Sequence, residues 1–240
     1  MPDKTVGILG GMGPEATIDL MKRILLITEK IGNVKDDTDH IRCIVDNNPK
    51  VPSRIKALIE RNGESPIPCM TDMAKRLEIW GADFLCIACN TAHNYLPEVK
   101  KSVKIPVLDM IMMTAEEVSK KYPNAKVGLL ASPAIRLTKI YEEPCKKFGL
   151  TPVYAEGEWE DRILKIIKDI KKGDTGINVI NEFKNIAENL SGKGASVQVL
   201  ACTELSIIGD SLNVPLIDAA DVLANNVVSI AKGFISMPNA

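Results

Sequence analysis

The feature that most constrains the fold is an internal repeat, in which three short segments recur in the same order. Val6-Gly7-Ile8-Leu9 recurs as Val127-Gly128-Leu129-Leu130, which is 121 residues later. Ala88-Cys89-Asn90-Thr91 recurs as Ala201-Cys202-Thr203-Glu204 at an offset of 113, and residues 105–109 recur as residues 214–218 at an offset of 109. Three matches at nearly one offset predict two similar halves.

Short β-branched runs alternate with amphipathic stretches, a pattern typical of parallel sheets with crossover helices. Apolar side chains recur at helical spacing between Met70 and Trp80 and between Ile177 and Leu190. We expect strands at residues 5–9, 41–46, 83–88, 107–109, 126–131, 151–154, 197–201 and 215–218. The predicted fold is therefore α/β, with residues 1–112 and 213–240 forming a first domain that contains Cys89. Residues 113–212 form a second domain that contains Cys202.

Composition excludes several classes of protein. The formal net charge is −1 and no basic run occurs, so nucleic-acid binding is not expected. No stretch approaches ~18 consecutive apolar residues, so no membrane span is expected. The first residues enter a strand pattern without the pattern of a signal peptide, and six cysteines are too sparse for a disulfide scaffold. We therefore expect a cytoplasmic protein with reduced thiols.

Cys89 and Cys202 lie at equivalent points of the repeat, each just past the carboxyl end of a predicted strand. Ligands of open parallel sheets bind outside these strand ends. Polar residues that can begin a helix follow each cysteine, and N–H groups at a helix N-terminus favour the thiolate. Either cysteine alone would more often be an ordinary buried residue. Together, one thiol can remove a Cα proton while the other returns a proton to the opposite face, which is what racemisation needs.

Four segments coincide, in order, with the motifs of a known family. They are residues 7–17 (GILGGMGPEAT), 47–54 (NNPKVPSR), 89–93 (CNTAH) and 202–205 (CTEL). Through them the chain resembles the cofactor-independent aspartate/glutamate racemases over nearly its whole length, and their aspartate racemase branch most closely. The resemblance implies two flavodoxin-like, doubly wound domains related by pseudo-twofold symmetry, an active site between them, and a homodimer.

The resemblance also implies roles for individual residues. The paired catalytic cysteines of the family correspond to Cys89 and Cys202, and its substrate-binding arginine corresponds to Arg54, whose planar fork suits a carboxylate. A lysine in the family's Ile-Lys-x-Gly stretch corresponds to Lys171. Two residues after the second cysteine, glutamate racemases have a histidine, whereas this chain has Glu204, as aspartate racemases do.

We therefore expect a racemase of aspartate, a small-molecule substrate, with no cofactor and no metal. Arg54 and Lys171 are expected to hold carboxylate groups. The other residues expected to bind substrate, beside the thiols or in the surrounding loops, are Met12, Asn90, Thr91, Ser132, Thr203 and Glu204. One residue departs from the family pattern. Ile135 stands where a threonine would donate a hydrogen bond to the substrate carboxylate, which leaves the exact substrate open.

The sequence leaves other functions open. The substrate could be glutamate or a broader range of amino acids, and a related cysteine-dependent isomerase or decarboxylase of small carboxylates is an alternative. A non-catalytic protein that binds acidic amino acids, or a redox flavodoxin-like protein, would have the same fold. Residues 11–16 loosely fit a dinucleotide fingerprint, but no convincing acidic residue follows ~20 positions later. Cys86 and Cys89 form a CxxC whose first member lies in an apolar run, which favours a core residue over a dithiol or, with His93, a zinc site.

Overall fold

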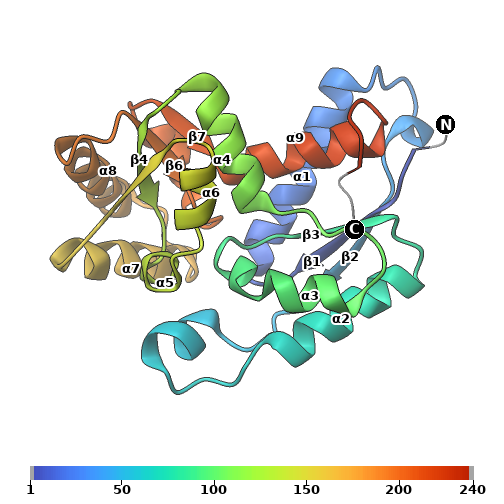
Figure 1. Cartoon of the computed structure of the whole chain (residues 1–240), viewed down its shortest axis with the longest axis horizontal. Coiled ribbons are helices and arrows are strands. Elements are labelled where there is room, and N and C mark those ends of the chain that lie inside the picture. Colours follow the sequence, from blue (N-terminus) through green and yellow to red (C-terminus); the bar gives the residue numbers. More distant parts are fainter. Residues whose placement is uncertain (1–2, 238–240) are drawn as a thin grey trace. The chain divides into compact units, whose positions relative to one another are not determined.

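In a computed structural model, which describes residues 3–237, the predicted strands form two parallel sheets (Figure 1). The first sheet has the order β2-β1-β3 and consists of β1 (Val6–Gly10), β2 (Cys43–Asn47) and β3 (Phe84–Ile87). The second has the order β5-β4-β6-β7 and consists of β4 (Lys126–Leu130), β5 (Thr151–Tyr154), β6 (Val197–Leu200) and β7 (Leu216–Asp218). Strands pair in parallel throughout, which confirms the predicted α/β class.

The two sheets belong to two units of the chain. The first unit contains the chain up to Met110 and from Asp221 onward, and the second contains Ile111–Ala220. β7 is hydrogen-bonded to β6, so it lies in the second unit. The sequence assignment placed residues 213–240 in the first domain, because a strand pattern does not show which neighbour a strand pairs with.

Helices connect and cover the strands. Those of the first unit are α1 (Pro14–Ile31), η1 (Asp37–Asp39), η2 (Lys56–Glu60), α2 (Ile67–Ile79), η3 (Thr91–Tyr95), α3 (Leu96–Ser102) and most of α9 (Ala219–Ala231). Those of the second are α4 (Met110–Lys121), α5 (Pro133–Thr138), α6 (Glu142–Lys147), α7 (Glu158–Ile170), α8 (Ile177–Gly192) and η4 (Leu205–Ser211). In the first unit, α2 and α3 pack together on one face of the sheet and α1 covers the other (Figure 1). In the second unit, α7 and α8 pack together on one face (Figure 1).

The repeat in the sequence is also a repeat of packing. Gly7 lies in the middle strand of the first sheet, where an added Cβ would come within 3.2 Å of side chains from Leu77, Ala82 and Leu85. Gly128 lies in the middle strand of the second sheet, where the corresponding neighbours are Leu190, Ala195 and Gln198. Each of these neighbours follows its counterpart by 113 residues. In both units, a helix therefore packs closely against a strand residue that has no side chain, which explains why both strands contain a glycine.

The fourth strand of each sheet is developed to a different extent. In the second unit, Gln198 N–H donates to Pro215 O at 2.8 Å and β7 is a full strand. In the first unit, Leu85 N–H donates to Pro106 O at the same distance, but Val107 forms only an isolated bridge to Leu85. The strand predicted at residues 107–109 is thus reduced to a bridge.

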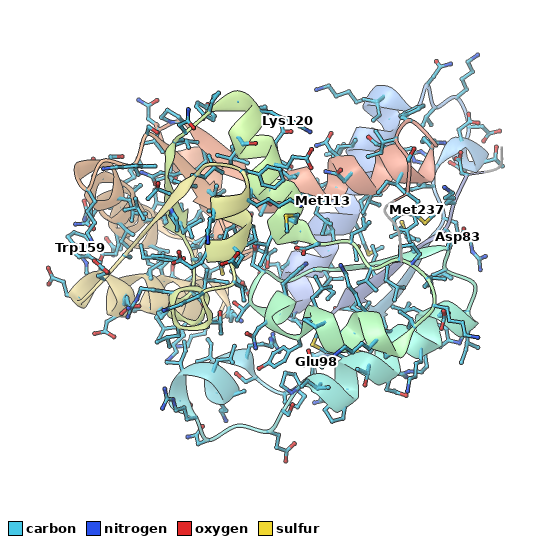
Figure 2. The ribbon with its side chains drawn as sticks, viewed as in Figure 1. Asp83, Glu98, Met113, Lys120, Trp159 and Met237 are labelled. Atoms are coloured by element: carbon cyan, nitrogen blue, oxygen red, sulfur yellow. The ribbon has the colours of Figure 1, made fainter. Side chains whose placement is uncertain are left out.

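The amino end of β3 is fixed by Asp83, which is labelled in Figure 2. Its Oδ2 accepts the Thr5 N–H at 2.6 Å, and its own N–H donates to Thr5 O at 2.8 Å. In the second unit Ser196 N–H donates to Lys126 O at 2.9 Å. Equivalent strands therefore start in the same register, so their carboxyl ends occupy the same place in each unit. Within residues 3–237, no helix is long and apolar enough to cross a membrane.

Candidate active site

Cys89 lies just past the carboxyl end of β3, where the sequence predicts it. The N–H of the preceding Ala88 donates to Leu9 O at 3.0 Å, so the strand ladder continues to the residue before the thiol. The Cys89 side chain is buried, with 7% of its surface exposed. No carboxylate among residues 3–237 is hydrogen-bonded to its sulfur.

His93 holds the backbone at Cys89. Its Nδ1 lies 2.9 Å from Cys89 O, and its Nε2 lies 3.2 Å from Met110 N. A carbonyl oxygen can only accept and a backbone N–H can only donate, so Nδ1 carries the proton and Nε2 accepts. Burial lowers the pKa of His93, which agrees with a neutral ring. His93 is thus a buried structural histidine rather than a surface or capping residue, and its role is to fix the loop that carries Cys89.

A short 3-10 helix follows each cysteine, where the sequence predicts that a helix can begin. η3 follows Cys89 with five residues, and η4 follows Cys202 with seven. Asn90 precedes η3 with 2% of its surface exposed and accepts the His93 N–H at 3.0 Å through its carbonyl, while Thr91 begins η3 half-buried. Short 3-10 helices have poorer hydrogen-bond geometry than α-helices, so they align fewer peptide dipoles toward each thiol.

Arg54 joins two loops at the carboxyl end of the first sheet. Its Nη2 donates to Met12 O at 2.8 Å, and its Nη1 donates to Pro52 O at 3.0 Å and to Val51 O at 3.4 Å. Nε is buried and has no hydrogen-bond partner among the described residues. The guanidinium is therefore held in place by backbone carbonyls and retains one buried donor that the first unit does not satisfy.

The loop that contains Met12 approaches the Asn48 loop closely. Gly11 has a φ of +84°, and an added Cβ would lie 2.2–2.4 Å from backbone atoms of Asn48. Thr17 Oγ1 accepts the Gly11 N–H at 2.9 Å and donates to Gly13 O at 3.1 Å. The glycines thus serve a close approach of two backbone segments, as expected for a loop that lines a pocket.

Cys202 occupies the same place in the second unit as Cys89 in the first. The N–H of the preceding Ala201 donates to Leu130 O at 2.9 Å, which repeats the Ala88–Leu9 bond. The Cys202 side chain is 6% exposed. Its surroundings differ, however, because its sulfur donates a hydrogen bond to Glu204 Oε2 at 3.1 Å.

Glu204 also pairs with Lys171, which is the first residue beyond α7. Lys171 Nζ lies 2.9 Å from Glu204 Oε1, and this contact is an ion pair rather than an aligned hydrogen bond. The lysine side chain is 37% exposed and the glutamate side chain is 9% exposed. The structure thus brings together Lys171, Glu204 and Cys202, three residues that the sequence predicted separately.

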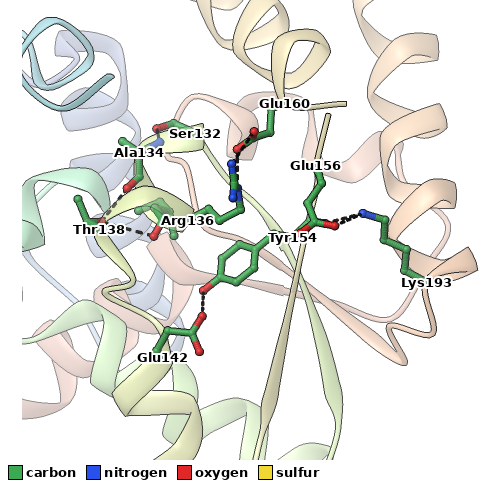
Figure 3. Close-up of polar contacts among 10 residues, drawn as sticks. Ser132, Ala134, Arg136, Thr138, Glu142, Tyr154, Glu156, Glu160 and Lys193 are labelled. Atoms are coloured by element: carbon green, nitrogen blue, oxygen red, sulfur yellow. Dashed lines mark hydrogen bonds and ion pairs between the residues drawn. The ribbon is translucent and has the colours of Figure 1, made fainter. Parts of the chain in front are cut away.

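Two further predicted residues lie near the strand ends of the second unit. Thr203 is buried, and its Oγ1 has no hydrogen-bond partner among the described residues. Ser132 caps α5, since its Oγ accepts the Ala134 N–H at 3.2 Å (Figure 3). Ile135, which departs from the family pattern, is fully buried in α5. Arg136, the next residue of α5, makes a bidentate ion pair with Glu160. Its Nε lies 2.7 Å from Oε1, and its Nη2 lies 2.8 Å from Oε2 (Figure 3).

The remaining candidate sites in the sequence have structural explanations. Cys86 is fully buried in β3, and burial strongly raises the pKa of its thiol. All six cysteines are free thiols, so Cys86 and Cys89 form no disulfide. Among residues 3–237, no cluster of three or more His, Cys, Asp or Glu side chains could hold a metal ion.

The profile of the family described as Asp/Glu/hydantoin racemase matches residues 9–227, a span that includes both cysteines and most of each unit. The chain belongs to the Asp/Glu/hydantoin racemase family. As a member of this racemase family it is an isomerase, and the resemblance seen in the sequence motifs is confirmed.

Relatives of the chain within the racemase family differ in their substrates. The broad-specificity amino-acid racemase of Bacillus subtilis is 26% identical over 226 residues, which are 93% of this chain and 96% of the relative. The glutamate racemase of Aquifex pyrophilus is 23% identical over 188 residues, which are 72% of this chain and 68% of the relative. The structure of Picrophilus torridus aspartate racemase is 31% identical, has a TM-score of 0.79, and matches 95% of this chain and 94% of its own. These relatives share amino-acid racemisation and differ in the amino acid.

Proposed function

We propose that this racemase interconverts L- and D-aspartate by a two-base reaction in which Cys89 and Cys202 exchange roles as proton acceptor and proton donor. The observation that carries the proposal is the equivalence of the two thiols. Each follows an alanine whose N–H closes the ladder to the central strand of its sheet, at 3.0 Å in the first unit and 2.9 Å in the second. Ligands of open parallel sheets bind beyond such strand ends.

The reaction needs a thiolate on one face of Cα and a thiol on the other. The thiolate takes the Cα proton, the C–H electron pair is delocalised toward the α-carboxylate, and the opposite thiol returns a proton to Cα. The inverted product leaves the two cysteines with exchanged protonation states. A free thiol ordinarily has a pKa of ~8.5, so only a small part of it is nucleophilic thiolate at neutral pH. The proposal uses no metal and no cofactor.

A carboxylate of the substrate would be bound by Arg54, because its buried Nε still lacks a partner within the described chain. An arginine that is already held by backbone carbonyls pays little entropy to present its fork. The unpartnered Oγ1 of Thr203 would be a second donor. Ser132 would be a third, since its hydroxyl accepts from Ala134 N–H and keeps its own proton to donate. We assign Met12, Asn90 and Thr91 to the surrounding wall.

Aspartate is favoured by the 31% identity to the aspartate racemase of Picrophilus torridus over nearly the whole of both chains. A broader substrate range is the second candidate. It is favoured by Ile135, which removes a carboxylate donor, and by the likeness to the broad-specificity racemase of Bacillus subtilis.

The test is a panel of amino acids assayed by chiral chromatography after dialysis against a chelator, without added pyridoxal phosphate. We expect both aspartate enantiomers to be inverted with a kcat/KM at least about tenfold above that of alanine, since one well-placed carboxylate contact contributes at least ~1.4 kcal/mol. The value should also exceed that of glutamate, whose additional methylene displaces its carboxylate. Equal rates on neutral amino acids would establish the broad-specificity alternative. Activity that required added metal or pyridoxal phosphate would contradict the proposed chemistry.

A further inference from the structure

We propose that Glu204 holds Cys202 in its thiol form in the substrate-free enzyme, that Lys171 positions Glu204 for this task, and that the two catalytic cysteines therefore begin a turnover in unequal protonation states. The proposal rests on the two-base function above and deepens it. It gives Lys171 a positioning role in the substrate-free enzyme, in addition to the substrate-binding role that the sequence motif implies.

The sulfur of Cys202 is in contact with the carboxylate of Glu204. Cys202 Sγ lies 3.1 Å from Glu204 Oε2, and both side chains are at least nine-tenths buried. A carboxyl group ordinarily loses its proton about 4 pH units below a thiol, so the shared proton belongs on sulfur. Ionisation of Cys202 would then place a thiolate beside a carboxylate, and like charges at this distance disfavour ionisation. The contact therefore favours the thiol.

The carboxylate of Glu204 is also in contact with the ammonium of Lys171. The ammonium lies 2.9 Å from Oε1, the oxygen that does not face Cys202. The ammonium therefore holds one carboxylate oxygen, which leaves Oε2 directed toward the sulfur. Lys171 is itself fixed at the end of α7, since its N–H donates to Ile167 O at 3.2 Å and Ile167 is buried.

Two other carboxylates of the second unit have hydrogen-bond or ion-pair partners of their own. Asp218, on the strand that pairs with β6, accepts from Ser206 Oγ at 2.9 Å and from Ala220 N–H at 2.8 Å. Asp169, on α7, pairs with Lys165 Nζ at 2.6 Å. Glu204 Oε2 accepts the hydrogen bond of the Cys202 sulfur at 3.1 Å.

The surroundings of Cys89 in the first unit differ from those of Cys202. Cys89 has an equivalent backbone setting, but no carboxylate among residues 3–237 is hydrogen-bonded to its sulfur. The hydrogen bond from sulfur to carboxylate is therefore a feature of Cys202 that Cys89 does not share among the described residues, and the proposal assigns the thiol form to Cys202. The substrate-free enzyme can then react directly with the enantiomer whose Cα proton faces Cys89, because Cys89 is the proton acceptor and Cys202 is the proton donor. Reaction of the other enantiomer requires a prior proton loss from Cys202 and proton gain by Cys89, both through solvent.

The test is the rate of alkylation of each cysteine by iodoacetamide in substrate-free enzyme between pH 6 and pH 9, with the sites separated by peptide mass spectrometry. In Glu204→Gln, which keeps the size and shape of the side chain, we expect Cys202 to react about tenfold faster at pH 7, because a neighbouring like charge disfavours ionisation by a unit or more. The alkylation profile of Cys202 should move to lower pH, and that of Cys89 should not move. Slower alkylation of Cys202 would show that Glu204 acts as its base, and an unchanged rate would show no coupling. Either result overturns the proposal.

Lys171 is tested in the same assay. We expect Lys171→Met to raise the rate of Cys202 alkylation toward that of Glu204→Gln, because Glu204 loses the contact that directs Oε2 toward the sulfur, and Lys171→Arg to keep the wild-type rate. Slower alkylation in Lys171→Met would show that Lys171 only offsets the charge of Glu204 and would contradict the positioning role. Lys172→Met is the matched control, since its side chain is 77% exposed. If Lys171→Met changed the KM for aspartate but left alkylation unaltered, Lys171 would be a substrate ligand and the positioning role would be wrong. Alkylation is measured without substrate, so these results stand apart from whether aspartate is racemised.

Discussion

Cys89→Ala and Cys202→Ala should each lower the rate of aspartate racemisation by about 10³-fold or more. General acid–base groups contribute ~10²–10⁴-fold each, and a two-base reaction that loses one thiol has no second proton carrier. The rate is measured by chiral chromatography at saturating aspartate. A near wild-type rate in either variant would eliminate the paired-thiol mechanism.

Two other cysteines provide matched controls for these variants. Cys86 is fully buried in β3, three residues before Cys89, and Cys145 is buried in α6 of the second unit. Burial raises the pKa of the Cys145 thiol to about 12, so this thiol is not a proton carrier at neutral pH. Cys86→Ala and Cys145→Ala should retain wild-type kcat/KM, although each cavity will lower the free energy of unfolding by about 1 kcal/mol.

Arg54→Ala should lower kcat/KM for aspartate by a factor between about 30 and several thousand. Truncation of a buried bidentate pair costs ~2–5 kcal/mol, and ~1.4 kcal/mol corresponds to tenfold. The same change removes the bonds to the Met12 and Pro52 carbonyls, so the free energy of unfolding should fall by ~1–3 kcal/mol. Arg54→Lys should also be poor, because an ammonium cannot reproduce the planar fork. Arg42→Ala, which changes an exposed arginine of the same unit, is the control.

The substrate dependence separates binding of the side-chain carboxylate from other roles of Arg54. A loss confined to aspartate and glutamate would place the side-chain carboxylate at Arg54. Equal losses on aspartate and alanine would place the α-carboxylate there, or show that Arg54 only supports the two loops. Unchanged kcat/KM for both would refute the assignment of the substrate to this loop.

Local patterns in the sequence predict the strands and the two thiols, because both depend on neighbouring residues. Apolar β-branched runs indicate the strands. The glycines of the two central strands, Gly7 and Gly128, lie in equivalent segments of the sequence repeat. The sequence assigns residues 213–220 to the first domain, whereas β7 pairs with β6 in the second unit, because strand pairing is a long-range property. The polar residues after each cysteine indicate a helix start but not the helix type, since such a run does not distinguish α from 3-10 hydrogen bonding.

Local sequence patterns do not predict the side-chain contacts around each cysteine. Lys171 and Glu204 are 33 residues apart in the sequence, and they meet only because the end of α7 lies against the loop after β6. His93 has a recognisable place next to Cys89, but its second bond, to Met110, depends on the course of a distant loop. The motif match names these positions, but a motif does not distinguish residues that bind substrate from residues that hold other side chains.

Two separate bases acting at Cα leave a distinct pattern of hydrogen isotopes at that carbon. Wild-type enzyme is incubated with L-aspartate in deuterated water, and both enantiomers are recovered at low conversion for mass spectrometry. The account predicts deuterium at Cα of nearly every D-aspartate molecule, because the returning proton comes from a solvent-exchanged thiol, while the remaining L-aspartate keeps protium. The reverse experiment from D-aspartate should give the mirror result. Protium retained in the product, or deuterium entering both enantiomers at equal rates, would mean that one base serves both faces and would contradict the account.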